Sequence, residues 1–413
     1  MGKLTQGPPL KRLGAMFCLQ NMMWGAQVVL LSGHLSELGF SGLQISYALA
    51  TSSLAALCSP LLAGWLADRF WPAQTFAGYS YLACAPLLWL AWRQTEFLPL
   101  WGIFLAFSLL HTPMMGLTNA IAFHHVGEMR FFGRIRVWGS VGWVGVSWVL
   151  SGYLRLWERA APGESHLGDG LLIAGGLSVL MGLYCFTLPH TPPRRGGGKS
   201  LAFTEAFGLL RQRDFAVLMG TAFVISVMSP FSYNFSFIFF VDAQHGPGFA
   251  DSSASWILSL GQLAELPLIP ALGLLLSRLG LRWTIFSGIL AAALRMVVLA
   301  WGEPVWLLVV SQVLNGYYIT CFLIASTMAV ERLSPDDLRA SAQSLLVLCI
   351  RGLGPLLGHG LAGFVHDHYQ LADGGRDWGA IFLVPSCVLL GGALCFGALF
   401  KGPAADGGGD RRR

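Results

Sequence analysis

Arg136, Ser140 and Trp143 are the side chains of this sequence whose types and spacing best suit chemistry. Their spacing of four and then three residues puts all three on one face of a helix. That face offers a fixed positive charge, a hydroxyl and an aromatic ring. Arginine at the centre of a membrane helix costs roughly 2.5 to 3.5 kcal/mol, so we expect Arg136 to face a wet cavity or a partner. Such a cavity would hold a polar organic solute.

Glu265 is the second candidate, because it is the one acidic residue far from any end of an apolar run. Gln262 lies one helical turn before it on the same face. Pro267 and Pro270 follow and can open the local hydrogen-bond ladder. An isolated carboxyl at this depth tends to be neutral or paired, which suits it to carry a proton or to bond a sugar hydroxyl. A buried carboxyl bonded to a neighbouring helix is the alternative.

Further polar side chains occur singly in other apolar runs, and each could bond either a solute or a neighbouring helix. Those that we assign to a cavity between the two halves are Gln20, Trp24, Asn119, Asn234 and Thr320. Arg351 has two possible roles: it lines the solute site, or it pairs with a neighbouring helix for structural reasons. Arg295 we expect at the periphery, where it snorkels or pairs.

The elements that must position these residues are membrane-spanning helices. The chain is 54% hydrophobic and 11% charged, whereas about 25% charged is usual for soluble proteins. Apolar runs of some 20 residues recur, and runs this long are helices rather than barrel strands. We count twelve, near 14–34, 43–66, 72–92, 98–123, 133–154, 169–189, 215–241, 253–276, 282–301, 304–329, 341–365 and 379–400.

The distribution of lysine and arginine predicts the orientation. With the N-terminus in the cytoplasm, only Arg93, Arg155, Arg159 and Arg376 among the loop residues fall outside, which is the positive-inside bias. Both termini are therefore predicted to be cytoplasmic. Residues 1–13 are polar and basic, so we expect the first helix itself, rather than a cleaved signal peptide, to direct insertion.

The basic, proline- and glycine-rich segment 190–213 interrupts the apolar pattern midway. It predicts a cytoplasmic linker between a six-helix bundle at 1–189 and another at 214–401, followed by a tail at 402–413. A layout of six plus six spans indicates two bundles that move relative to each other.

Enzyme motifs are absent from the sequence. It has no phosphate-binding G-x-x-x-x-G-K-[ST] pattern, and its histidine pairs lack supporting ligands. We therefore expect no catalytic activity, no cofactor, no metal and no nucleic-acid partner. The expected partners are a small solute, a proton and the lipid bilayer, with the chain acting as a monomer.

The stretch Gly64-Trp-Leu-Ala-Asp68-Arg69 resembles the motif between spans 2 and 3 of the major facilitator superfamily. The resemblance implies the major facilitator fold, all-α with twelve helices in two bundles. It also implies a gating role for Asp68 and Arg69, which would hold a neighbouring helix in one state of the transport cycle.

The segment 134–143 further resembles the start of span 5 in the nucleoside:proton symporters, the nucleoside permease branch of that superfamily. Similar stretches lie at 113–119, before this segment, and at 187–192, 262–265, 294–304 and 339–343 after it. The resemblance implies a symporter that imports nucleosides across the bacterial inner membrane. It also assigns substrate-site roles to Arg136, Ser140, Trp143, Gln262 and Glu265, with Asn234 the best match in span 7.

One departure from the family pattern leaves alternatives open. The family carries an aspartate in span 10, where this chain reads Gly316-Tyr-Tyr-Ile-Thr320-Cys. Glu265 would then be the sole proton carrier, or the protein would be a facilitator without proton coupling. Arg-x-Arg followed by Gly-Trp also resembles the disaccharide:proton symporters, with Trp143 on the sugar ring. A non-transporting membrane sensor or scaffold is the alternative from another class.

Overall fold

The computed structural model describes residues 9–66, 72–126, 129–192 and 206–402, and these residues are nearly all helical. The first half contains α1 (Leu10–Val28), α2 (Leu31–Glu37), α3 (Gly42–Leu66), α4 (Ala73–Arg93), α5 (Phe97–Val126), α6 (Met129–Ala160) and α7 (Asp169–Cys185). The second half contains η1 (Leu209–Arg211), α9 (Arg213–Val241), α10 (Asp251–Trp301), α11 (Val305–Ser311), α12 (Val313–Tyr318), η2 (Ile319–Ile324), α13 (Ala325–Leu333), α14 (Arg339–Val347), η3 (Leu348–Leu353), α15 (Gly354–His368) and α16 (Trp378–Leu399).

Every apolar run predicted from the sequence is occupied by helix, and the all-α membrane fold is confirmed. Among the described residues, seven helices are long and apolar enough to cross a membrane. One of them, α10, joins two predicted spans at Gly280, whose φ of 74° lies in the left-handed region that favours glycine.

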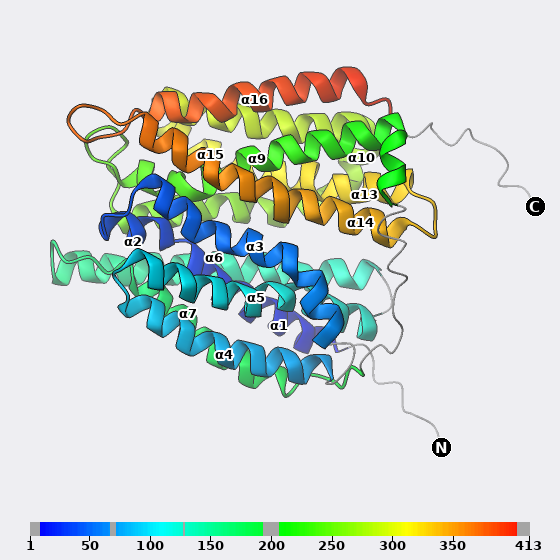
Figure 1. The fold of residues 1–413 in the computed structure, drawn as a ribbon, viewed down its shortest axis with the longest axis horizontal. Helices are drawn as coiled ribbons and strands as arrows, with labels where there is room; N and C mark the ends of the chain where they lie inside the picture. Colours follow the sequence, from blue (N-terminus) through cyan, green and yellow to red (C-terminus); the bar gives the residue numbers. More distant parts are fainter. Residues whose placement is uncertain (1–8, 67–71, 127–128, 193–205, 403–413) are drawn as a thin grey trace, which may run out of the picture.

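The helices form two bundles that lie side by side (Figure 1). In the N-terminal bundle, α1 packs on α6 and α7, while α5 packs on α3 and α4. In the C-terminal bundle, α9 and α10 pack on α16, and α15 packs on α9. The bundles meet along two pairs of helices, α3 against α15 and α6 against α10. The residue boundaries of the bundles and linker stay a prediction.

Two glycines allow helices to approach closely near the candidate residues. A Cβ atom on Gly142 of α6 would collide with the backbone carbonyl oxygen of Cys18 on α1. A Cβ on Gly316 of α12 would collide in the same way with the carbonyl oxygen of Gly261 on α10. Small residues at such crossings let membrane helices pack backbone to backbone. Trp143 is thereby held against α1, and α10 is held against α12.

Two helices of the C-terminal bundle contain π-helical turns. These are η2 and η3, and they carry Thr320 and Arg351 respectively. A π-helical turn inside an α-helix is rare and is frequently found at functional sites.

The two ends of the molecule differ. One end carries α2 and the segments 161–168, 242–250 and 369–377 (Figure 1, left); it is called here the outer end because the distribution of lysine and arginine predicts that it faces outside. At the opposite end α1 begins and α16 ends.

Candidate solute-binding site between the two bundles

A hydrogen bond joins the two bundles at the middle of the molecule. The Ser140 hydroxyl on α6 donates to a carboxylate oxygen of Glu265 on α10, at 3.3 Å. Arg136 lies one turn before Ser140 and interacts electrostatically with Glu265. The cation, the hydroxyl and the carboxyl expected from the sequence therefore lie together, although they come from different bundles.

Aromatic rings form the second part of this cluster. Trp143 packs edge-on against Trp24 of α1, with ring centroids 5.0 Å apart and planes at 81°. The guanidinium carbon of Arg351, from η3 in the other bundle, lies 6.0 Å from the centre of the Trp24 ring. A cation at this distance from an indole is attracted to the ring face. Arg351 thus reaches across the interface.

Three of the polar side chains are exposed although they lie at least one helical turn inside membrane-spanning helices. Arg136 and Arg351 are exposed, and Tyr233 of α9 is 50% exposed. Tyr233 interacts electrostatically with Arg351, Arg295 and Glu265. Charges that faced lipid at this depth would be costly, so these groups face the gap between the bundles. We call the set Arg136, Ser140, Trp143, Trp24, Tyr233, Glu265 and Arg351 the central site.

Gln262 borders the central site, one turn from Glu265. Its side-chain oxygen is buried and has no hydrogen-bond partner among the described residues. A buried acceptor without a donor is costly, and a ligand or a water molecule that donates to it would remove that cost.

Four other predicted side chains lie apart from the central site. Gln20 is buried and accepts a hydrogen bond from Thr118 of α5 at 2.9 Å. The Asn234 amide donates to Ser46 Oγ of α3 at 2.9 Å, so it joins the bundles nearer the outer end. Thr320 is buried in η2, and Asn119 is half-buried on α5. No hydrogen bond among the described residues joins these four to the central site.

The expectation for Arg295 was wrong. Arg295 is 4% exposed and lies inside the C-terminal bundle rather than at its periphery. It donates to Gln312 Oε1 at 2.8 Å and to the hydroxyls of Ser232 and Ser236. Its guanidinium group is therefore stabilised by buried polar side chains, whereas its place in the sequence had indicated that it extends to the membrane surface.

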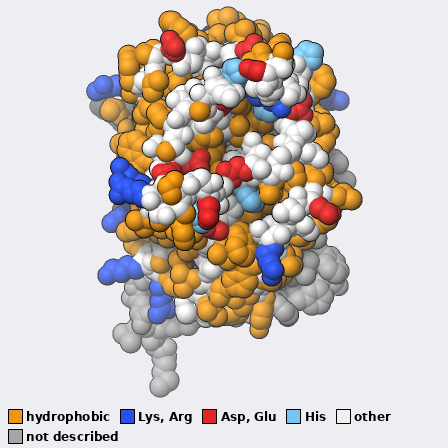
Figure 2. All heavy atoms as spheres, turned by 90° about the vertical axis from the view of Figure 1, so that its left-hand side faces the viewer, with side chains coloured by type: hydrophobic (Ala, Val, Ile, Leu, Met, Phe, Trp, Pro, Cys, Tyr) orange, Lys and Arg blue, Asp and Glu red, His pale blue; other side chains and the backbone are white. Residues whose placement is uncertain are grey.

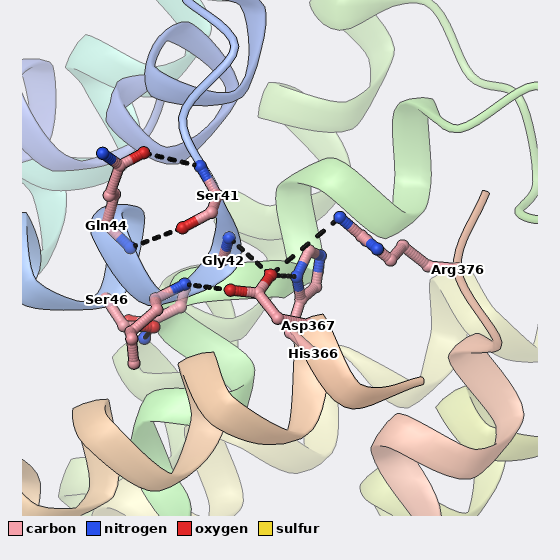
Figure 3. A network of polar contacts seen from close by, with 9 residues as sticks. Ser41, Gly42, Gln44, Ser46, His366, Asp367 and Arg376 are labelled. Atoms are coloured by element: carbon pink, nitrogen blue, oxygen red, sulfur yellow. Dashed lines mark hydrogen bonds and ion pairs between the residues drawn. The ribbon is translucent and has the colours of Figure 1, made fainter. Parts of the chain in front are cut away.

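The sequence analysis missed a contact at the outer end. Asp367, at the end of α15, accepts hydrogen bonds from the backbone N–H groups of Gly42 (2.7 Å) and Leu43 (2.9 Å) (Figure 3). These N–H groups begin α3, where a carboxylate is stabilised by the free donors and the helix dipole. His366 and Arg376 approach the same carboxylate. We call the contact between Asp367 and the start of α3 the outer clamp.

A second contact supports the closure of this end. The Glu158 carboxylate of α6 accepts from the backbone N–H of Ser252 (2.9 Å) and from its hydroxyl (2.7 Å), both at the start of α10. Glu37 and Glu158 both repel Asp251 electrostatically. Seen from the outer end, acidic side chains gather near the middle of the face (Figure 2).

In the part of the chain that the structure describes, the hydrogen bonds between the two bundles all lie in one half of the molecule. Of the hydrogen bonds that the structure gives for its described residues, those between bundles run from Ser140 and Glu265 toward the outer end. Asp68 and Arg69, predicted to gate the opposite end, lie outside the described residues. Among the described residues, polar contacts therefore hold the two bundles together at the outer end.

Known proteins share this architecture and much of the sequence. Residues 10–405 match the family described as nucleoside H+ symporter. The chain belongs to the nucleoside H+ symporter family. It is 32% identical to YegT of Escherichia coli over 86% of this chain and 84% of that protein. It is 28% identical to the Escherichia coli xanthosine permease, over 90% of this chain and 91% of the permease.

The fold agrees with that assignment. The crystal structure of the nucleoside transporter NupG superposes with a TM-score of 0.82 at 26% identity, covering 95% of this chain and 99% of NupG. In sequence, the nucleoside permease NupG of Escherichia coli is 28% identical over 93% of this chain and 94% of the permease. This symporter is thus a membrane transporter of the major facilitator type and not an enzyme.

Proposed function

We propose that this symporter imports nucleosides together with protons across the bacterial inner membrane, by alternating access. The observation that carries the proposal is the Ser140–Glu265 hydrogen bond, which links the bundles beside a fixed cation and two tryptophans. A nucleoside offers complementary groups, because its base can stack on an indole and its ribose hydroxyls can bond Ser140, Gln262 and Glu265. Nucleosides are also what the names of the relatives specify.

Glu265 is the proposed proton carrier. It is the acid within the central site, where it accepts a hydrogen bond from Ser140 and interacts electrostatically with Arg136 and Tyr233. When the carboxyl is ionised, it attracts Arg136 and holds α6 against α10. When it is protonated, that attraction is lost, and the carboxyl can donate a hydrogen bond to substrate. Proton and substrate would then together change the balance between the two open states.

The outer clamp and the proposed cytoplasmic gate would alternate. The Asp367 contact must break before a solute enters from outside, while Asp68 and Arg69 would close the opposite side. Cytoplasmic termini and a monomeric chain remain part of the proposal, as does movement of the 1–189 bundle against the 214–401 bundle.

Glu265→Gln tests the proposal, since glutamine mimics the protonated carboxyl. Proteoliposomes of this variant should exchange labelled nucleoside for unlabelled nucleoside but should not accumulate it when a pH gradient is imposed. Glu303→Gln, in the segment after α10, is the matched control and should accumulate nucleoside as the unmodified protein does.

Two outcomes would contradict this assignment. Accumulation by Glu265→Gln would place the proton elsewhere. Exchange without any pH-driven accumulation by the unmodified protein would make it a facilitator, the alternative favoured by Thr320 and its neighbours, which include no acid.

A further inference from the structure

The central site holds more positive than negative charge. Arg136 and Arg351 come from different bundles, yet they are close enough to repel each other. Glu265 is the carboxylate that interacts with Arg136, and one carboxylate cannot neutralise two guanidinium groups. With Glu265 ionised these three side chains sum to one positive charge, and with Glu265 protonated they sum to two.

Arg295 adds to this excess. It lies within electrostatic reach of Tyr233, as Arg351 and Glu265 do. Its hydrogen bonds go to an amide and two hydroxyls, all of them neutral. The C-terminal bundle therefore places two arginines, Arg351 and the buried Arg295, and one carboxylate within electrostatic reach of Tyr233.

The carboxylates of the outer end do not offset this charge. Glu158 lies 18 residues beyond Ser140 on α6, about 27 Å away at the helical rise of 1.5 Å per residue. In water at physiological salt, charges are largely screened beyond about 8 Å. At that distance Glu158 does not neutralise the arginines of the central site.

We propose that the central site selects nucleosides whose base carries a negative charge. The charge belongs on the base rather than on the ribose because Arg351 lies over Trp24, whose ring packs against Trp143. A base that packs against these indoles would bring its edge toward the guanidinium, whose planar donors match a carboxylate or an ionised ring amide. This inference rests on the proposed function and specifies its substrate class.

The test compares two uridines of nearly equal size and shape, together with unsubstituted uridine, on the purified protein. These are 5-carboxyuridine, which is anionic, its neutral carboxamide analogue and uridine itself. The carboxylate should bind at least about tenfold more tightly than the carboxamide, the ratio that one charge-assisted hydrogen bond supplies. Arg351→Gln should remove most of that ratio, while Arg351→Lys, which keeps the charge, should retain most of it.

The comparison in the unmodified protein decides the matter even if Arg351→Gln does not fold. Equal binding of carboxylate and carboxamide would overturn the inference while leaving the proposed function intact, since neutral nucleosides would still bind. If Arg351→Gln still prefers the carboxylate, the inference would also be overturned, because a residue other than Arg351 would bind the negative charge. Failure of all three compounds and of a panel of purine nucleosides to bind would overturn both proposals.

Discussion

At the scale of single residues, Trp143 is the side chain whose contribution is easiest to isolate. Its ring contacts Trp24 with the two planes at 81°, and it is half-buried, so part of its surface is open to a ligand. Stacking of a base on an aromatic side chain is worth roughly 1 to 3 kcal/mol. Trp143→Phe should keep most of the affinity for a nucleoside, whereas Trp143→Ala should weaken it about tenfold or more.

Titration calorimetry of the purified variants measures this effect. Trp306→Ala is the control, because Trp306 lies on α11 and is 65% exposed, away from the central site. Unchanged affinity in Trp143→Ala would remove this ring from the ligand site.

Arg136 gives a second prediction at this scale. Arg136→Ala removes the cation that faces Ser140 and Glu265, so uptake should fall to background while the protein still folds and reaches the membrane. Uptake into cells, with the amount of protein measured in the membrane fraction, provides the readout. Arg155→Ala, on the same helix near the outer end, should behave as the unmodified chain. Undiminished uptake by Arg136→Ala would mean that its charge has no part in transport.

At the scale of elements, the crossing of α1 and α6 determines where Trp143 lies. Gly142→Ala forces a Cβ atom into the carbonyl oxygen of Cys18, and the backbone on both sides leaves no flexible atom to move. Overpacking of this kind costs about 1 to 3 kcal/mol. The melting temperature of the purified protein should fall by several degrees, and nucleoside binding should weaken as Trp143 is displaced.

The same helix supplies the control. Gly145 has nothing within 4 Å of the position where its Cβ would be built, so Gly145→Ala should leave both melting temperature and binding close to their original values. Equal effects of the two substitutions would show that helix propensity, rather than the close crossing, determines stability here.

At the scale of the whole molecule, we expect the outer clamp to bias the equilibrium between the two open states. Asp367→Asn removes the charge that the start of α3 stabilises, an interaction worth about 1 kcal/mol. The outward-open population should therefore rise about fivefold.

Spin labels at Glu164 and Ala372, in exposed segments of the outer end on different bundles, would report this change as a greater share of long distances. The exposed cysteines Cys58, Cys387 and Cys395 must first be replaced. Asp373→Asn, in the same segment as Ala372, is the matched control because its carboxylate bonds His245 of its own bundle. An unchanged distance distribution in Asp367→Asn would show that the clamp does not hold this end closed.

The sequence by itself determined the properties that depend on local spacing. Helical periodicity places Arg136, Ser140 and Trp143 on one face, and the length and apolarity of the runs require membrane helices. The isolation of Glu265 within an apolar run was visible in the same way. These inferences need neither a partner helix nor a register between helices.

Only the tertiary structure decided which faces meet. Asp367 and Gly42 are 325 residues apart, and nothing in their local sequences links them. Arg295 was misplaced because spacing cannot distinguish a helix face turned to lipid from one turned to Gln312 and Ser232. Arg351 was left ambiguous because its ring contact lies on Trp24 in the other bundle. Packing between helices far apart in the chain sets each of these contacts. The net charge of the central site therefore follows only from the tertiary structure, which brings residues of both bundles together.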